Sequence, residues 1–212
     1  TAQGTELVHA FGSPTGEMGV NVIVRGQGDR LYFTVGDPKG TSNMWSTDGS
    51  AEGPRPLKTT QNDEPLLLNH YTGCMIGGIH YLSARQYVES GLWRTDGTAE
   101  GTRPLKQFAA PPGVIFPLDE QRFVFAADDG EIGQELWISG GTPETTTLLK
   151  DIYPGPESSG LSDCSRFMSP TGRPSVVFAA TSPDAGRELW VTDGTPEGTQ
   201  LRADLIPGSG TS

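Results

Sequence analysis

Several residue types on which catalytic and metal sites depend are scarce in this sequence. Its 212 residues include two cysteines, Cys74 and Cys164, and three histidines, His9, His70 and His80. The cysteines lie far apart and form no CxxC pair, so a zinc or redox site is not indicated; they either pair with each other or remain free thiols. No HExxH or GxSxG pattern occurs, and a catalytic triad would have to be assembled from distant parts of the chain.

Basic residues and long apolar runs are also few. Lys and Arg number 15 against 26 Asp and Glu, which gives a formal net charge of −11. This balance argues against nucleic-acid binding, because such binding needs clustered cations, and it disfavours an anionic membrane surface. No apolar run approaches the roughly 18 residues expected of a membrane helix, and no signal peptide is visible at Thr1. We therefore expect neither a nucleic-acid partner nor membrane insertion.

The sequence contains instead many glycines (29) and prolines (17), placed between short apolar runs like the turns of an all-β protein. One 15-residue stretch occurs in four degraded copies, which begin at Met44, Leu92, Leu136 and Leu189. The copies read MWSTDGSAEGPRPLK, LWRTDGTAEGTRPLK, LWISGGTPETTTLLK and LWVTDGTPEGTQLRA. Their tryptophans follow one another at intervals of 48, 44 and 53 residues. This is the mark of a repeat-built fold.

Each repeat is predicted to contain a hairpin, a tight turn and a further strand. An aromatic residue precedes each Trp by twelve positions (Phe33, Tyr81, Phe125 and Phe178), which predicts a hairpin of constant register. An Asp-Gly turn follows the Trp, replaced by Gly140-Gly141 in the third copy, and the next strand carries Leu57, Leu105, Leu148 and Leu201. With one strand before the hairpin, four-stranded repeats occupy residues 12–60, 61–109, 110–152 and 153–205.

Four-stranded repeats of about 40–50 residues are typical of β-propeller blades. We therefore expect an all-β fold in which residues 1–212 form one β-propeller of four antiparallel blades. Residues 4–11 align with residues 198–205, so five copies of the last strand accompany four copies of the others. The surplus strand leaves three alternatives: five blades, part of a larger ring, or a homo-oligomer in which a partner chain accepts the spare strand.

The repeats resemble the ELWxxDGT repeat family, also labelled hyalin-like, of bacterial secreted and surface proteins. ELW at 135–137 and ELWVTDGT at 188–195 match its motif, and DIYPG at 151–155 matches its linker together with Ser158 and Ser159. The resemblance covers nearly the whole chain; Met44, Gly91 and Ser139-Gly140 depart from the motif. It implies a β-propeller in an extracellular, cell-surface or periplasmic setting, and it supplies no catalytic residue.

The most regular positions of the repeat are expected to be structural: Trp45, Trp93, Trp137, Trp190, Asp48, Asp96 and Asp193. Tryptophan rings would suit a platform for sugars, but a Trp fixed in mid-strand more often packs between sheets. The turn aspartates would suit calcium, but they more often hold the turn itself. The acidic group of Asp128, Asp129 and Glu131 is a somewhat better calcium candidate, although such runs are usually solvated. No other cofactor is indicated.

Binding residues are expected where the repeats disagree, in the variable loops at 61–71, 85–91, 128–134 and 181–187. The second repeat departs most from the pattern, and it supplies His70, Tyr71, Arg85 and Tyr87 as ligand-binding candidates. The leading interpretation is a non-enzymatic extracellular module that presents these loops to a protein or glycan ligand. The alternatives are a structural element that assembles through the surplus strand, and a hydrolase with a site at the propeller axis, for which carboxylate pairs are plentiful.

Overall fold

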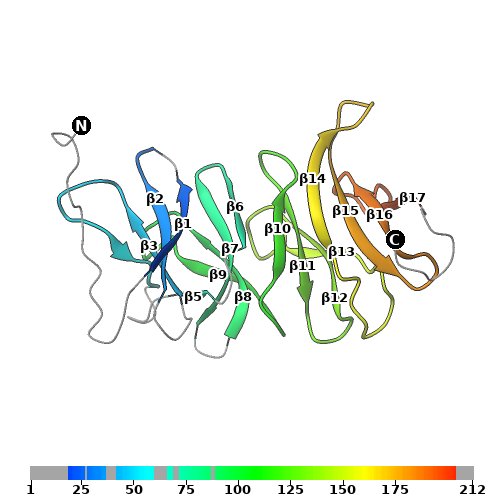
Figure 1. Cartoon of the computed structure of the whole chain (residues 1–212), viewed down its shortest axis with the longest axis horizontal. Coiled ribbons are helices and arrows are strands. Elements are labelled where there is room, and N and C mark those ends of the chain that lie inside the picture. Colours follow the sequence, from blue (N-terminus) through cyan, green and yellow to red (C-terminus); the bar gives the residue numbers. More distant parts are fainter. Residues whose placement is uncertain are drawn as a thin grey trace.

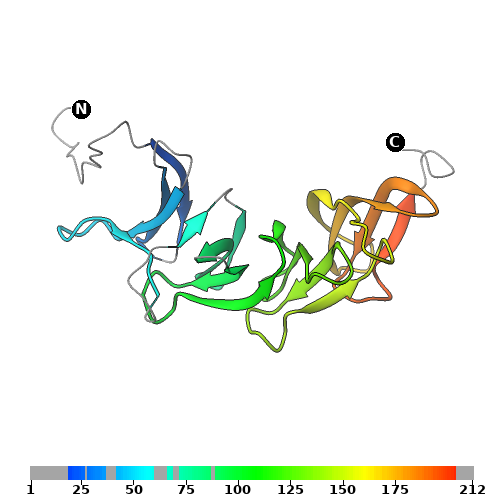
Figure 2. The same cartoon turned by 90° about the horizontal axis from the view of Figure 1, so that it is seen from below.

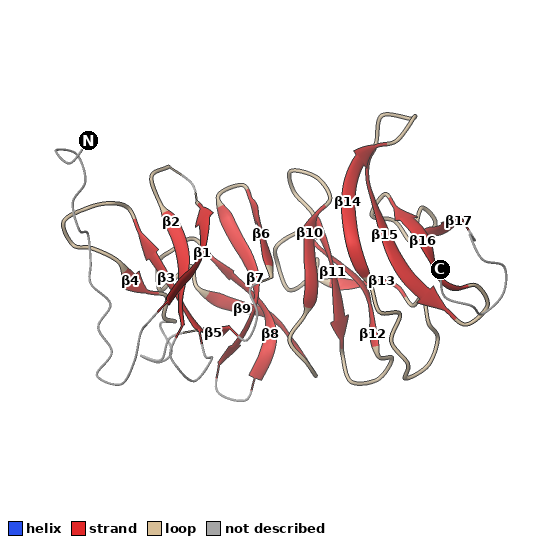
Figure 3. Ribbon diagram, viewed as in Figure 1, coloured by secondary structure: helices blue, strands red, loops and turns tan. Residues whose placement is uncertain are grey.

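The computed structural model describes residues 19–26, 28–36, 42–59, 66–68, 72–86 and 89–203. In this part of the chain the regular elements are 17 strands. For these residues, Figures 1 and 3 show strands and loops and no helix. The described residues accordingly contain no helix that could cross a membrane. The surplus strand expected at residues 4–11 lies outside the described residues.

The strands fall into four consecutive antiparallel units, one for each repeat. Unit 1 holds β1 (Gly19–Arg25), β2 (Leu31–Gly36), β3 (Ser42–Thr47) and β4 (Arg55–Pro56). Unit 2 holds β6 (Gly73–Ile76), β7 (Ile79–Gln86), β8 (Glu89–Thr95) and β9 (Arg103–Phe108). Unit 3 holds β10 (Gly113–Pro117), β11 (Phe123–Asp128), β12 (Gln134–Ser139) and β13 (Thr147–Lys150). Unit 4 holds β14 (Ser162–Met168), β15 (Pro174–Ser182), β16 (Gly186–Thr192) and β17 (Gln200–Ala203).

The predicted all-β fold of antiparallel sheets is confirmed, but four separate sheets are not seen. Units 3 and 4 are separate four-stranded sheets, whereas the short β5 (Leu67–Leu68) joins units 1 and 2 into one nine-stranded sheet. Leu67 pairs with Asn43 of β3 and with Arg85 of β7. The units form an open row with unit 1 at one end and unit 4 at the other (Figures 1 and 2). A closed four-bladed ring therefore stays a prediction.

The central hairpins have the expected register in three units. Phenylalanine lies directly opposite tryptophan in the pairs Phe33–Trp45, Phe125–Trp137 and Phe178–Trp190. In unit 2 the prediction is wrong, because Leu82 lies opposite Trp93. Two residues separate the last pair of that hairpin, Gln86 and Glu89, whereas five or three residues separate the last pairs of the others. An even number of connecting residues shifts the pairing register by one residue. Tyr81 therefore lies on the face of the sheet opposite to Trp93.

The leucine alignment in the fourth strands also needs correction. Pro56, Pro104, Leu148 and Leu201 lie opposite the four tryptophans. The structural counterparts of the buried Leu57 and Leu105 are therefore Leu149, which is buried, and Arg202, which is exposed. Leu148 and Leu201 are 39% and 38% exposed. The third and fourth repeats have one residue fewer between the Trp and the aligned leucine, so aligning these leucines places Leu148 and Leu201 one residue away from the structural counterparts of Leu57 and Leu105.

The core lies between neighbouring units, in three clusters of one type. At each boundary the later unit packs the face that contains its Trp against the preceding unit, whose opposing face combines aliphatic side chains with aromatic ones such as Tyr32 and Tyr81. Between units 3 and 4, for example, Val124 and Leu136 of unit 3 pack in one cluster with Phe178 and Trp190 of unit 4. The other two clusters join unit 1 to unit 2 and unit 2 to unit 3 in the same way. Consecutive units are thus fixed by apolar burial, which is the main stabilising term of repeat proteins.

The turn after each Trp is held by its own side chains. In unit 4 the Asp193 carboxylate accepts bonds from the Thr195 amide (3.0 Å) and hydroxyl (2.7 Å), and the Thr192 and Thr199 hydroxyls bond each other at 2.8 Å. Unit 2 has the same network around Asp96. The hydrogen bonds from Thr195 hold the pKa of Asp193 below its ordinary value, against the opposing effect of burial. The turn aspartates therefore have a structural role that is visible in the contacts.

In units 2, 3 and 4 the glycine of the turn after the Trp also touches the preceding unit. The backbone is left-handed at Gly97, Gly141 and Gly194, with φ of 89°, 90° and 85°. A Cβ there would lie 2.5 Å from Arg30, 2.2 Å from Tyr81 and 2.5 Å from Leu118, respectively. Glycine is thus required for the turn and for the approach of the units. Among the described residues, nothing lies within 4 Å of a Cβ built on Gly49 of unit 1.

The glutamate of the ELW motif fixes the connection between units 3 and 4. Glu135 is fully buried, and its carboxylate accepts bonds from the amides of Ile152 (2.8 Å), Tyr153 (3.3 Å) and Ser159 (3.1 Å). Burial raises the pKa of Glu135, and these amides oppose that rise. In unit 2 the same position is Gly91, where a Cβ would lie 2.5 Å from the Lys106 carbonyl oxygen. The motif glutamate therefore holds the DIYPG linker in place through hydrogen bonds to its backbone amides.

Both cysteines are free thiols, which decides between the alternatives left by the sequence. Cys74 is buried in the core between units 2 and 3, and Cys164 is half-buried against the core between units 3 and 4. Burial raises the pKa of both thiols to about 12. They are therefore protonated and poorly nucleophilic at neutral pH.

Candidate binding clefts between the units

Of the four ligand-binding candidates, only Arg85 lies among the described residues; His70, Tyr71 and Tyr87 fall outside them. Arg85 lines a cleft of about 420 Å³ between units 2 and 3, together with Leu67 of β5 and residues 111–114 before and within β10. Its Nε is buried and has no hydrogen-bond partner in the described part of the chain. A guanidinium in an apolar cleft is suited to a carboxylate or carbonyl oxygen.

The acidic loop between β11 and β12 is organised as a turn. Asp128 accepts a bond from the Gly130 amide at 2.7 Å, and Asp129 accepts one from the Glu131 amide at 3.1 Å. Among the described residues, no group of three or more His, Cys, Asp or Glu side chains is placed to hold a metal ion. The structure therefore does not bring Asp128, Asp129 and Glu131 together as ligands.

The tryptophans of units 2, 3 and 4 lie in the cores, with exposures of 3%, 4% and 8% for Trp93, Trp137 and Trp190. Trp137 donates from Nε1 to the Ala127 carbonyl at 3.1 Å and meets Phe108 of unit 2 edge-on, with ring centroids 5.1 Å apart. Trp45 of unit 1 is half-buried. The three buried rings do not offer their faces to a ligand.

His80 is the one histidine within the described residues, and it is fully buried between units 1 and 2, beside Tyr32. Burial lowers its pKa to about 4. It is therefore neutral at pH 7 and lies away from the clefts described here. Its place in the sheet, opposite Thr95, is taken by Phe123 in unit 3.

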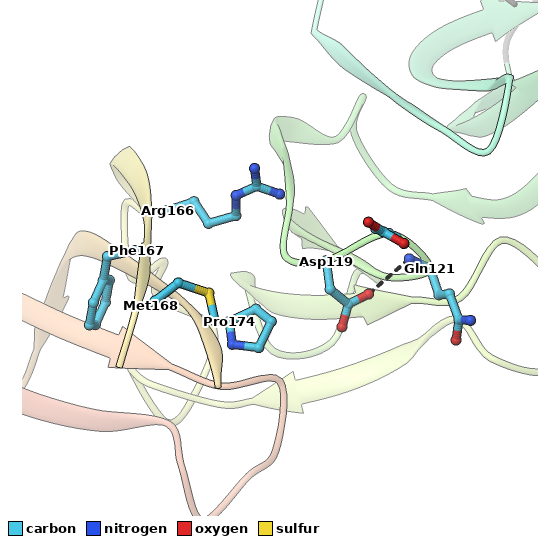
Figure 4. A pocket seen from close by; sticks show the side chains of 7 residues that line it. Asp119, Gln121, Arg166, Phe167, Met168 and Pro174 are labelled. Atoms are coloured by element: carbon cyan, nitrogen blue, oxygen red, sulfur yellow. Dashed lines mark hydrogen bonds between the residues drawn. The ribbon is translucent and has the colours of Figure 1, made fainter. Parts of the chain in front are cut away.

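A second cleft is a groove of about 590 Å³ between units 3 and 4, which we call the unit 3–unit 4 groove. It is lined by Asp119, Glu120, Gln121, Arg166, Phe167, Met168 and Pro174. Figure 4 shows Arg166 and Met168 of β14 directed toward Asp119 and Gln121 of the β10–β11 turn, whereas the Phe167 ring points to the other face of β14. One wall is thus acidic, whereas the other carries a cation and the large apolar side chain of Met168.

The second wall exists because the hairpin β14–β15 is longer than its counterpart β10–β11. In unit 3 the hairpin ends with the pair Pro117–Phe123; in unit 4 two further pairs, Phe167–Ser175 and Met168–Pro174, extend it. We call residues 167–175 the hairpin extension; Figure 1 shows it projecting beyond the neighbouring units. The 53-residue interval between Trp137 and Trp190 was the only sequence signal for it. The repeat alignment predicts one ordinary strand before each hairpin and therefore does not predict this groove.

The acidic wall is rigid. Asp119 accepts bonds from the Gln121 amide (2.9 Å) and the Arg122 amide (2.7 Å), and Arg122 donates from Nε to the same carboxylate at 2.8 Å. Although burial acts in the opposite direction, these hydrogen bonds and the Arg122 charge hold the pKa of Asp119 below its usual value. Asp119 is therefore ionised at neutral pH and carries a fixed negative charge at the groove.

Comparison with known proteins identifies a similar fold and no family. No family model matches the sequence, and a search of curated proteins found no match. The chain is similar to the crystal structure of puromycin hydrolase, with a TM-score of 0.54 and 15% identity, over 86% of this chain and 28% of that one. A serine-to-alanine mutant of that hydrolase complexed with PGG aligns with a TM-score of 0.52 and 14% identity, over 82% and 27% of the two chains. This chain thus spans just over a quarter of puromycin hydrolase, and the similarity shows the fold alone.

Proposed function

We propose that this chain is a non-enzymatic, extracellular interaction module that binds a segment of another protein in the unit 3–unit 4 groove. The observation that carries the proposal is the exposure of Phe167 (39%) and Met168 (63%) on the hairpin extension. Large apolar side chains held in solvent beside charged residues are characteristic of interaction sites. A methionine adapts its shape to different apolar partners.

A protein segment suits this groove better than a glycan. The tryptophan rings of units 2, 3 and 4, which would stack on sugars, are buried in the cores. The groove offers Met168 as an apolar anchor, Asp119 and Glu120 for a cationic side chain, and Arg166 for an acidic one. Phe167 lies on the opposite face of β14 and adds exposed apolar surface to the hairpin extension. Apolar anchors flanked by charges of both signs fix the position and direction of a bound segment.

We also propose that the four units are part of a β-propeller larger than four blades. At three successive boundaries the Trp of the later unit is buried against the preceding unit, and this repeated packing supports a propeller. The open row of units supports a larger ring over a closed ring of four (Figure 2). The assignment to the ELWxxDGT repeat family and the single domain over residues 1–212 are part of this proposal, because they rest on the repeat motifs.

A peptide-display selection on the immobilised chain tests the proposed function. Enriched peptides are expected to combine apolar residues with charges of both signs, and their affinity is measured by fluorescence anisotropy. Phe167→Ala with Met168→Ala is expected to weaken binding at least about tenfold, as loss of apolar anchors does. Val20→Ala is the matched control, because Val20 is 49% exposed and lies in unit 1. Equal affinities for all three proteins, or hits on a glycan array without peptide hits, would refute the proposal.

A further inference from the structure

Arg85, in the cleft between units 2 and 3, is a cation without a counter-ion in the described part of the chain. Its side chain is half-buried, and its Nε is buried without a hydrogen-bond partner there. The other described residues that line the cleft carry no charge: Leu67, Thr72, Ser83, Ala84 and residues 111–114. A charged donor that lacks an acceptor is costly to bury, so this cleft favours a ligand that brings an acceptor oxygen.

The unpaired charge is particular to Arg85 and is not a general property of its place in the repeat. Asp128 holds the corresponding place in unit 3, because each of the two residues lies opposite the third residue before the Trp of its unit. The Asp128 carboxylate accepts a bond from the Gly130 amide of its own turn at 2.7 Å. The polar group is therefore satisfied locally in unit 3, whereas in unit 2 it is left for a ligand.

The walls of the cleft are fixed by the chain itself. Thr72 joins them, because its carbonyl accepts a bond from the Ser83 amide of unit 2 at 3.0 Å and its hydroxyl accepts one from the Ile115 amide of unit 3 at 3.1 Å. Pro111 and Pro112 form part of the unit 3 wall, and the proline ring fixes φ. A cleft with fixed walls loses little conformational entropy when a ligand binds.

The chemistry of the cleft selects a small ligand that combines a carboxylate with an apolar body. The planar guanidinium matches the two oxygens of a carboxylate. A phosphate carries more charge and would be better matched by several cations, whereas Arg85 is the only charged residue in the described lining. Leu67, Val114 and the two prolines supply apolar surface. The volume of about 420 Å³ lies within the range of roughly 300–1,000 Å³ that is typical of small-molecule sites.

We propose that the cleft between units 2 and 3 binds a small carboxylic acid with an apolar body. The Arg85 guanidinium donates to the carboxylate, and the apolar body packs against Leu67 and the wall formed by Pro111 and Pro112. This site shares no lining residue with the unit 3–unit 4 groove. The acid therefore binds independently of a protein segment in that groove.

Isothermal titration calorimetry of the whole chain with three probes tests the proposal. The first probe, 3-phenylpropionate, has both required parts and is expected to bind with a Kd of about 1 mM or lower. The second, 3-phenylpropionamide, keeps the apolar body without the charge, and the third, acetate, keeps the carboxylate without the apolar body. Each of these two is expected to bind about tenfold more weakly or worse.

Variants of Arg85 locate the binding. Arg85→Met removes the charge and keeps an unbranched apolar side chain, so it is expected to weaken 3-phenylpropionate binding about tenfold or more. Arg85→Lys keeps the charge without the planar fork and should give a smaller loss. Arg103→Met is the matched control, because Arg103 is exposed on β9 of the same unit and does not line the cleft. Thermal melting without ligand shows whether each variant is folded.

Three results would overturn the proposal. The first is that 3-phenylpropionate does not bind, and the second is that the amide binds as tightly as the acid. The third is that a folded Arg85→Met or Arg85→Lys variant binds the acid as well as the wild-type chain does, or no more weakly than Arg103→Met does. Losses confined to the Arg85 variants, larger for Met than for Lys, would support it.

Discussion

At the scale of single residues, the third repeat shows what the Asp-Gly turn requires. In units 2 and 4 a Cβ on Gly101 or Gly198 would lie 2.0 Å from an oxygen of the turn aspartate, so the aspartate and the later glycine occupy one space together. Unit 3 has glycine at 140 and Thr145 at the later position, and the Thr145 hydroxyl accepts a bond from the Gly140 amide at 3.2 Å. The turn thus holds either an aspartate with a later glycine or a glycine with a later threonine, because the two side chains would occupy the same space.

This exchange predicts strong coupling between positions 140 and 145. Gly140→Asp alone crowds Thr145, and Thr145→Gly alone removes its hydrogen bonds; each is expected to lower the free energy of unfolding by about 1–2 kcal/mol. The double variant rebuilds the network of units 2 and 4 and should recover most of this loss, with a coupling energy of about 1 kcal/mol or more. Urea unfolding of the four proteins measures the cycle. Additive effects of the two substitutions would show that the positions are independent.

The buried His80 predicts a loss of stability in mild acid. Its pKa is about 4 in the folded chain and 6.5 ordinarily, so between these values the unfolded chain binds a proton that the folded chain does not. The His80 contribution is therefore fully present above pH 6.5 and is lost as the pH falls toward 4, by about 3 kcal/mol in total. His80→Phe, which copies Phe123 of unit 3, is expected to flatten the dependence of the unfolding free energy on pH between 7 and 5. Parallel curves for the two proteins would exclude this role.

At the scale of elements, periodic spacing predicted the hairpins but not their pairing or packing. The twelve-residue interval located β2–β3, β11–β12 and β15–β16 with their registers, because odd-numbered connections keep Phe opposite Trp. The register shift in β7–β8 depends on the number of residues that connect the two strands. The interval between Tyr81 and Trp93 does not reveal this number. The strand β5 was also not predicted, because a two-residue strand has no periodicity.

The candidate site was less predictable than the fold. Arg85 was named from the irregular second repeat and does line a cleft, yet the sequence could not place residues 111–114 beside it. The unit 3–unit 4 groove depends on two extra residue pairs and on the approach of the β10–β11 turn from another unit. Such a juxtaposition arises from the packing of whole units against each other. A repeat alignment shows which positions correspond in different units, and it does not show which positions of neighbouring units touch.

At the scale of the whole molecule, each unit depends on its neighbours for burial, and this predicts how disruption spreads. Phe178 lies in the core between units 3 and 4 and contributes nothing to the cores of the other boundaries. Phe178→Ala should cost about 3–5 kcal/mol locally, because a repeat protein is stabilised by nearest-neighbour contacts. Hydrogen exchange followed by mass spectrometry is expected to show faster exchange in β14–β17 and unchanged exchange in β6–β9. Phe167→Ala, on the exposed hairpin extension, is the control and should leave both regions unchanged. Equal acceleration in all units would instead mean that the row of units unfolds as one cooperative body.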